Sequence, residues 1–220
     1  MLTDDPRPFW LNPLGDARNE AILSAAFNVF QEKGLHGSTM LEIATAAKVS
    51  KETLYARFDS KEGLFYALLA WGSGKSAVDP DFLDESALKD PLKALHDYAA
   101  ALLIKMLQPE SVAVHRIAVG EAMRMPEVAR VFDEFTCQVG EKIVNRIADA
   151  LEAQGLAKID DRHAFGEAFI GLLRGNLHHQ VMIGLVPSPP PEACRAYAHR
   201  AMNDLMKIYA PTAVAGRVAA

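Results

Sequence analysis

Apolar residues recur at helical spacing in the first part of the chain, between Asp16 and Lys33. The residues that follow this spacing are Ile22, Ala25, Ala26, Val29 and Phe30. Positions i, i+3, i+4, i+7 and i+8 share one face of an α-helix, so the stretch predicts an amphipathic helix. Gly34 can adopt a positive φ and is expected to end that helix.

Two shorter helices are predicted next, on either side of a turn at residues 48–50. The first begins where Ser38 or Thr39 can cap free backbone N–H groups, and the second begins after Ser50. Leu54 and Phe58 lie four residues apart and can pack together on the first helix of the pair. The positions left for the outer face are Lys51, Glu52, Tyr55 and Ala56. A short helix with an exposed first turn, backed by a second helix, has the geometry of a major-groove reader.

The rest of the chain continues in helices bounded by proline, glycine and capping residues. Ser60 opens a fourth helix, which is expected to stop at the Gly-Ser-Gly sequence of residues 72–74. The expected starts of the next five helices are Pro91, Pro109, Pro126, Asp160 or Asp161, and the residues that follow the proline-rich break at 187–191. No strand pattern is evident. The predicted fold class is therefore all-α, with about nine helices.

Composition bounds the size of the fold and removes bulk charge as an argument. The 220 residues can hold one large or two small domains with a real core. The formal net charge is −5, and the segment Asp16–Glu62 carries six Lys or Arg against seven Asp or Glu, a balance of 6 − 7 = −1. Four of those six cations fall between Lys48 and Lys61. The segment is thus not basic, although its cations gather around the predicted outer face.

Several classes of protein are disfavoured. No apolar run is long enough to span a bilayer, and residues 1–14 carry no apolar signal core, so we expect a cytoplasmic protein without a membrane partner. Cys137 and Cys194 are too few and too isolated for a disulfide framework or a zinc site. The chain has no His-Glu-x-x-His spacing, nucleophile–base pairing or phosphate loop. No catalytic residue, metal site or cofactor is predicted, and the protein is not expected to be an enzyme.

The helical pair carries a motif with many fixed spacings over about residues 18 to 66. Its residues read Ile43-Ala44-x-x-Ala47-x-Val49-Ser50-Lys51-x-Thr53-Leu54-Tyr55-x-x-Phe58-x-Ser60-Lys61-Glu62-x-Leu64, preceded by Ile22-Leu-x-Ala25-Ala26-x-x-x-Phe30-x-x-x-Gly34. This motif resembles the DNA-binding signature of the TetR/AcrR transcriptional regulators. A helix-turn-helix pattern alone would be far less specific, because any two helices joined by a tight turn imitate one.

The resemblance implies a set of residues that contact double-stranded DNA. The predicted set is Ser38, Thr39, Lys48, Ser50, Lys51, Glu52, Thr53, Tyr55, Arg57 and Lys61. Hydroxyls, helix N-termini and cations bind phosphate oxygens, whereas base reading would fall to Lys51, Glu52 and either Thr53 or Tyr55. The alternative is that the hydroxyls only cap helices and that Lys51 is a solvated cation.

Three positions depart from the family pattern. Lys48 stands where glycine is most frequent, so the turn either strains a residue with a side chain or relaxes slightly. Ala56 replaces a frequent aromatic residue, and Arg57 stands where histidine is common. These departures leave the operator sequence open.

The second half resembles the family more loosely, through His115-Arg-Ile-x-x-Gly-Glu-Ala-x-x-x-Pro126-Glu-x-Ala129-x-x-Phe132. The resemblance implies that the last two helices of two subunits form a four-helix bundle, and hence a homodimer. Small residues that would allow close helix approach there are Gly166, Ala168, Gly171 and Gly175. Ordinary packing within one chain is the alternative.

A pocket for a small, largely apolar effector is predicted among the middle helices. The candidate residues are Met106, His115, Met123, Phe132, Phe135, Phe169, Leu172, Arg174 and His178. The apolar members and the adaptable methionines would form the walls, and the histidines and the arginine would orient the effector. The alternative is that the apolar residues are simply core.

These interpretations divide the chain into a flexible arm at residues 1–15, a helix-turn-helix domain at 16–62 and a regulatory and dimerisation domain at 75–220, with a connecting helix to about residue 74. The predicted function is a sequence-specific homodimeric repressor that a small effector releases from a near-palindromic operator. The rival interpretation is a helical small-molecule-binding protein or enzyme that retains an ancestral helix-turn-helix domain.

Overall fold

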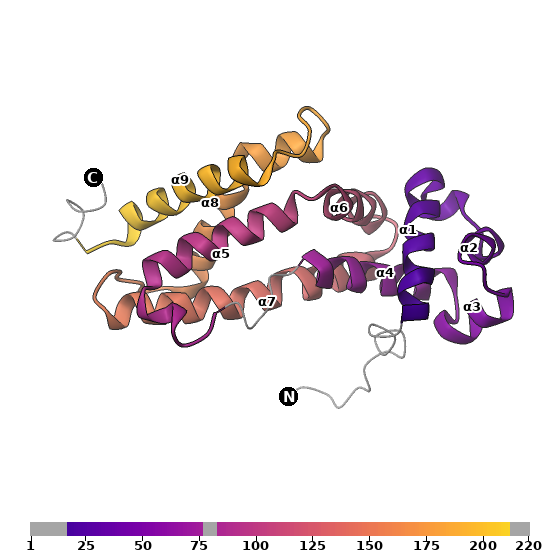
Figure 1. Cartoon of the computed structure of the whole chain (residues 1–220), viewed down its shortest axis with the longest axis horizontal. Coiled ribbons are helices and arrows are strands. Elements are labelled where there is room, and N and C mark those ends of the chain that lie inside the picture. The colour runs from indigo at the N-terminus through magenta and orange to yellow at the C-terminus, as the bar shows by residue number, and fades with distance from the viewer. Residues whose placement is uncertain (1–16, 77–82, 212–220) are drawn as a thin grey trace. The chain divides into compact units, whose positions relative to one another are not determined.

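The computed structural model describes residues 17–76 and 83–211, without the side chains of residues 73–76 and 135–139. The arm predicted at residues 1–15 lies outside the described residues. The described chain forms nine α-helices and one 3₁₀ turn and contains no strand, which confirms the all-α prediction (Figure 1). The elements are α1 (Ala17–Gly37), α2 (Met40–Ala46), α3 (Lys51–Phe58), α4 (Lys61–Ser76), η3 (Ala87–Lys89), α5 (Pro91–Met106), α6 (Pro109–Ala122), α7 (Pro126–Ala153), α8 (Arg162–Met182) and α9 (Pro191–Tyr209).

The contacts between these helices divide the chain into two compact units. The first comprises the residues up to Lys75 together with Ala113–Phe135, and the second comprises Ser76–Val112 together with the chain from Thr136 onward. Both α6 and α7 therefore contribute residues to each unit. By function, the sequence divides the chain into a helix-turn-helix domain that ends at residue 62 and a regulatory domain that begins at residue 75. That functional division stays a prediction.

The core of the first unit joins the first helices to parts of α6 and α7. Leu54 and Phe58 of α3 are fully buried, and the rings of Phe30 and Phe65 meet edge to face at 5.6 Å. Each large apolar side chain buried in this way contributes about 1.5–3 kcal/mol. The residues that α6 and α7 add to the same core are Val114, Ala118, Val128 and Val131.

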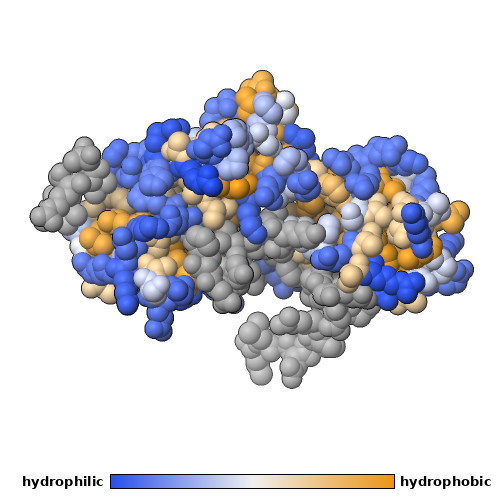
Figure 2. All heavy atoms as spheres, viewed as in Figure 1, coloured by the Kyte–Doolittle hydropathy of each residue, from blue (hydrophilic) through white to orange (hydrophobic). Residues whose placement is uncertain are grey.

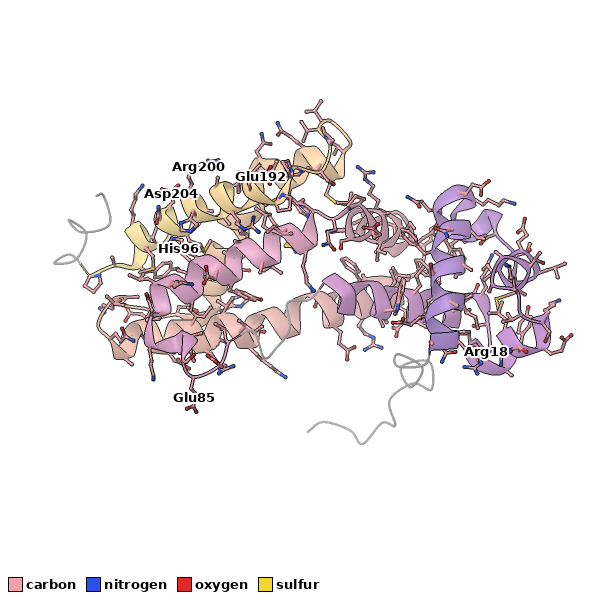
Figure 3. The ribbon with its side chains drawn as sticks, in the orientation of Figure 1. Arg18, Glu85, His96, Glu192, Arg200 and Asp204 are labelled. Atoms are coloured by element: carbon pink, nitrogen blue, oxygen red, sulfur yellow. The ribbon has the colours of Figure 1, made fainter. Side chains whose placement is uncertain are left out.

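The core of the second unit is built from α5, α8, α9 and the rest of α7. The ring of Tyr98 stacks on that of Phe169 at 5.9 Å, and burial raises the pKa of Tyr98 to about 12. A polar contact also joins α5 to α9: the Nε2 atom of His96, labelled in Figure 3, lies 3.0 Å from Oδ1 of Asn203. The same ring stacks on His199 at 4.3 Å.

Most helix ends follow the sequence prediction, and one does not. Gly34 leaves the helical conformation at φ 71° and ψ 170°, and one further turn completes α1. Ser60 and Asp161 cap α4 and α8 with side-chain oxygens that accept backbone N–H groups. The predicted stop of α4 at residues 72–74 is wrong, because the helix continues to Ser76.

Close packing, not a turn, explains the glycine at position 72. A Cβ atom on Gly72 would lie 3.0 Å from Cγ2 of Val114, so the missing side chain lets α6 approach α4. Glycine in a helix interior costs only about 1 kcal/mol relative to alanine. The full burial of Leu68 and Leu69 on the same helix outweighs that cost.

A break inside α8 was not predicted from the sequence. Gly175 adopts φ 41° and ψ −151° within the helix, a conformation that favours glycine. The hydroxyl of Tyr197 on α9 lies 2.0 Å from where a Cβ atom on Gly175 would stand. At this glycine the close approach is made by a helix of the same chain. At Gly166 and Gly171, by contrast, no neighbouring helix or side chain among the described residues comes within 4 Å of the corresponding position.

Gly63 offers a test of the packing between α3 and α4. A Cβ atom there would lie 2.3 Å from the backbone oxygen of Phe58, so Gly63→Ala is expected to lower the free energy of unfolding by about 1–3 kcal/mol. Gly120→Ala on α6 is the matched control, since no neighbouring side chain or helix in the described part of the chain lies within 4 Å of its Cβ position. It is expected to raise that free energy by about 0.4–1 kcal/mol. Urea denaturation of both variants measures the difference, and equal stability would contradict the close contact.

Candidate nucleic-acid interface

The start of α2 is held by a reciprocal pair of hydrogen bonds. The Thr39 hydroxyl accepts the N–H of Glu42 at 3.2 Å, and the Glu42 carboxylate accepts the N–H of Thr39 at 2.8 Å. Lys33 of α1 donates to the same carboxylate at 2.6 Å. The donor Lys33, followed by the donors of Thr39, lowers the pKa of Glu42 to about 2. Of the two capping candidates, Thr39 is therefore the cap.

The start of α3 is held by Ser50. Its hydroxyl accepts the N–H of Thr53 at 3.1 Å, and the hydroxyls of Ser50 and Thr53 lie 3.0 Å apart. A hydrogen bond from the backbone N–H of Glu52 itself, with help from Ser50, lowers the pKa of its carboxyl below the usual range. The first turn of α3 thus presents exposed hydroxyls and a carboxylate that stays charged.

The two faces of α3 are those predicted from the spacing. Leu54 and Phe58 are fully buried, whereas Lys51 and Glu52 are exposed and Tyr55 is 42% exposed. The Lys51 ammonium lies over the Tyr55 ring, 5.6 Å from its centroid, at a distance typical of a cation–π contact. A cation and an aromatic ring therefore stand side by side on the outer face of α3.

The sequence left open whether the turn at Lys48 is strained or relaxed, and the structure has the strained conformation. Its φ is 55°, in the left-handed region, while its side chain is exposed in the turn between α2 and α3. A residue with a Cβ atom pays roughly 1–2 kcal/mol for this backbone conformation. The turn keeps the geometry that glycine usually provides and adds an exposed cation.

Two cations of the predicted set make contacts within the chain that the sequence did not indicate. Lys61 donates to the backbone oxygens of Leu35 at 2.7 Å and Ser38 at 3.0 Å. Arg57 donates to Oδ1 of Asn19, a buried residue of α1. The buried Ser38 hydroxyl itself donates to the Leu35 oxygen at 2.8 Å, so Ser38 and Lys61 share one acceptor.

The contacts of Lys61 connect the start of α4 to the end of α1 and to the start of α2. The contact of Arg57 connects α3 to the start of α1. Their only signal in the sequence was Asn19, a polar residue on a predicted amphipathic helix. Its partner is 38 positions away, beyond the reach of any local pattern.

The predicted effector residues fall on both compact units. Those on the second unit are Met106, Phe169, Leu172, Arg174 and His178, and those on the first are His115, Met123 and Phe132. The side chain of Phe135 lies outside the described residues. Phe169 is buried, and the rings of His115 and Phe132 meet at 5.0 Å. Met123, however, is 92% exposed, so within a single chain it lines no interior wall.

Two features are absent from the described part of the chain: a helix that could cross a membrane and a cluster of metal-binding side chains. Within the described part of the chain, no helix combines the length and the apolar character needed to cross a membrane. Across the same residues, no cluster of three or more His, Cys, Asp or Glu side chains could hold a metal ion.

Two family models together match most of the chain. Residues 22–68 match the model described as "Bacterial regulatory proteins, tetR family". Residues 93–211, more than half of the chain, match the model described as "AefR-like transcriptional repressor, C-terminal domain". The chain belongs to the TetR family of transcriptional regulators. The α2–turn–α3 segment of this TetR-family regulator lies within the residues that match the tetR-family model.

Named relatives agree with this assignment. The TetR-family chain is 27% identical to UidR of Escherichia coli strain K12 over 134 residues, which cover 59% of the chain and 64% of UidR. It is 37% identical to RutR of the same strain over 94 residues, which cover 39% of the chain and 44% of RutR. The match thus spans less than two thirds of either relative. A solved structure, "Flavonoid-responsive Regulator FrrA", is 29% identical, with coverage of 89% and 98% and a TM-score of 0.72.

The positive φ of Lys48 predicts that glycine stabilises this TetR-family helix-turn-helix. Lys48→Gly is expected to raise the free energy of unfolding by about 1 kcal/mol, because glycine adopts this conformation without the clash of a Cβ atom. Lys48→Ala removes the same charge but keeps the Cβ atom, and its stability is expected to stay within about 0.5 kcal/mol of the natural protein. Denaturant titration distinguishes the two, and a glycine variant no more stable than the alanine variant would rule out backbone strain.

Proposed function

We propose that this TetR-family regulator is a homodimeric repressor, released from a near-palindromic operator by a small, largely apolar effector. The observation that carries the proposal is the outer face of α3, where Lys51 and Tyr55 are exposed on a fully anchored helix. The segment that holds it has a net charge of −1, counted above from the sequence. A single copy therefore has little bulk attraction for DNA, and two copies at fixed spacing would supply the missing affinity.

The proposed contacts divide into two groups by their geometry. Lys48, Lys51, Glu52 and Tyr55 are exposed and would meet the major groove, and Thr39, Ser50 and Thr53 would meet phosphates at the two helix starts. Ser38, Arg57 and Lys61 already bind other parts of the chain. Their proposed role is to position the others, with any contact to DNA secondary.

The outer surfaces of α8 and α9 support a dimer through the last two helices. Among the described residues, no neighbouring side chain or helix lies within 4 Å of the Cβ positions at Gly166 and Gly171, so another helix could approach there. Figure 3 labels Glu192, Arg200 and Asp204 along α9, and both signs of charge on one exposed surface suit a two-fold contact with itself.

The turn between α8 and α9 adds apolar surface to this region. Ile183 and Leu185 are 62% and 67% exposed there, and Figure 2 shows the apolar tip that they help to form. Large exposed apolar side chains in a cluster are typical of surfaces that meet a partner. We propose that this tip belongs to the dimer contact.

Release by an effector requires a difference in affinity between two conformers. The effector would have to bind the conformer with the wrong spacing of the two α3 helices more tightly than the DNA-competent one. The name of FrrA states that it responds to flavonoids, which supports a small aromatic effector for this similar chain. The match to the AefR-like repressor model supports repression over activation. Because a regulator acts on DNA, the location that goes with the proposal is the cytoplasm.

Selection of bound DNA from random fragments tests the proposal against the rival helical carrier or enzyme. The expected result is one enriched sequence with two inverted half-sites whose centres lie about one helical turn, roughly 10 base pairs, or a multiple of it apart. Enrichment of a single half-site would contradict the dimer. Failure to enrich any sequence, together with turnover of a bound small molecule, would favour the rival.

The two lysines at the ends of the motif are expected to separate in their effects on the selected operator. Lys51→Met should lower the slope of log affinity against log salt concentration by about one per subunit, because one exposed cation near DNA is lost. Lys61→Met should leave that slope unchanged but lower the free energy of unfolding by about 1–3 kcal/mol, because two backbone oxygens lose a charged donor. Anisotropy titrations at several salt concentrations, with denaturation as control, measure both. The opposite pattern would make Lys61 the DNA contact.

A further inference from the structure

Arg174 in the second unit is a partly buried cation with an unsatisfied hydrogen-bond donor. The Nε atom of Arg174 on α8 is shielded from solvent and has no hydrogen-bond partner within the described chain. None of the ion pairs between described residues includes this guanidinium. An unsatisfied buried donor destabilises the folded state, and more so when it is charged. Folded proteins rarely keep such groups, and those that remain call for an explanation.

The position of Arg174 in the fold points to a ligand with an apolar body. The preceding residue, Leu173, is fully buried in the core of the second unit, and Phe169 in the previous turns is 2% exposed. Ile170 lies one helical turn before Arg174 on the same side of α8 and is half-buried against that core. Arg174, itself half-buried, thus lies on α8 among residues that pack into the apolar core of the second unit.

The break in α8 lies immediately after this arginine. Gly175 leaves the helical conformation, and the Tyr197 hydroxyl occupies the space beside it. A side chain at position 175 would collide with the Tyr197 hydroxyl, so the residue after Arg174 packs directly against α9. Close packing of the main chain beside Arg174 limits the backbone entropy that ligand binding at this position would cost.

We propose that Arg174 anchors the carboxylate of an otherwise apolar organic acid, and that this acid is the effector of the proposed repressor. The Nε–H and one Nη–H of a guanidinium point in the same direction and match the two oxygens of a carboxylate. A ligand with a single anionic oxygen would satisfy only one of these donors. The proposal rests on the proposed function for the word effector, while the anion site itself is independent of DNA.

Calorimetric titration of the full chain without DNA tests the site, with 2-naphthoate as the probe and 2-naphthalenemethanol as its neutral counterpart. The acid is expected to bind at least about tenfold more tightly than the alcohol, since a buried charge-assisted pair contributes that much or more. Arg174→Met should remove this preference and bring both probes to the affinity of the alcohol. Arg146→Met, which removes an exposed cation from α7, is the matched control and should keep the preference.

A ligand-free measurement separates an anchor from a structural residue. If Arg174 waits for a ligand, Arg174→Met should be at least as stable as the natural protein, because it removes an unsatisfied donor. A loss of stability in Arg174→Met would indicate a structural role and overturn the proposal. Arg174→Lys keeps the charge without the paired donors, and it should fold and retain only part of the preference for the acid.

The remaining outcomes also decide the matter. Equal affinity of the natural protein for acid and alcohol, or no binding of the acid up to about 1 mM, would overturn the proposal. So would a preference that survives in Arg174→Met. A failed DNA selection alongside an acid preference that depends on Arg174 would refute the repressor and leave the anion site standing. An operator that binds while the acid does not would do the reverse.

Discussion

The apolar core of the first unit is the constraint on which the DNA-binding surface depends. Leu54 and Phe58 anchor the inner face of α3 in it, and without that anchor the outer face would have no fixed direction. The same core contains Val114 of α6 and Val128 of α7, so α3 shares a core with segments far along the chain. Both α6 and α7 also contribute residues to the second unit.

Polar contacts add orientation to this apolar anchor. The capping box of Thr39 and Glu42 and the cap of Ser50 set where α2 and α3 begin. Lys61 then ties the end of α1 to the residue before that capping box through two backbone oxygens. Hydrogen bonds of this kind contribute modestly to stability, yet they fix angles that packing alone leaves free. DNA recognition needs those angles because base edges accept donors only over a narrow range of directions.

The helix-turn-helix segment offers no net positive charge. The helix-turn-helix segment is slightly acidic in sum, and two of its six cations, Arg57 and Lys61, are committed to contacts within the chain. Lys48 in the turn before α3 and Lys51 at its first residue are exposed. Recognition would then depend on a few groups at fixed positions, each held by packing beneath it. The proposed role of Arg174 follows the same principle in the second unit, because one cation with an unsatisfied Nε would bind a single anion.

The sequence by itself determined the helices, the caps at Ser50 and Ser60, and the inner and outer faces of α3. These features depend on residues within one or two turns of each other, and spacing records such local relations directly. Tertiary structure alone decided that Lys61 and Arg57 bind the chain, that α4 continues past Gly72, that α8 breaks at Gly175, and that Met123 is exposed. In each case the outcome depends on whether a residue distant in the sequence packs against the group in question. Side-chain and backbone groups choose among several locally acceptable states according to which distant surface packs against them.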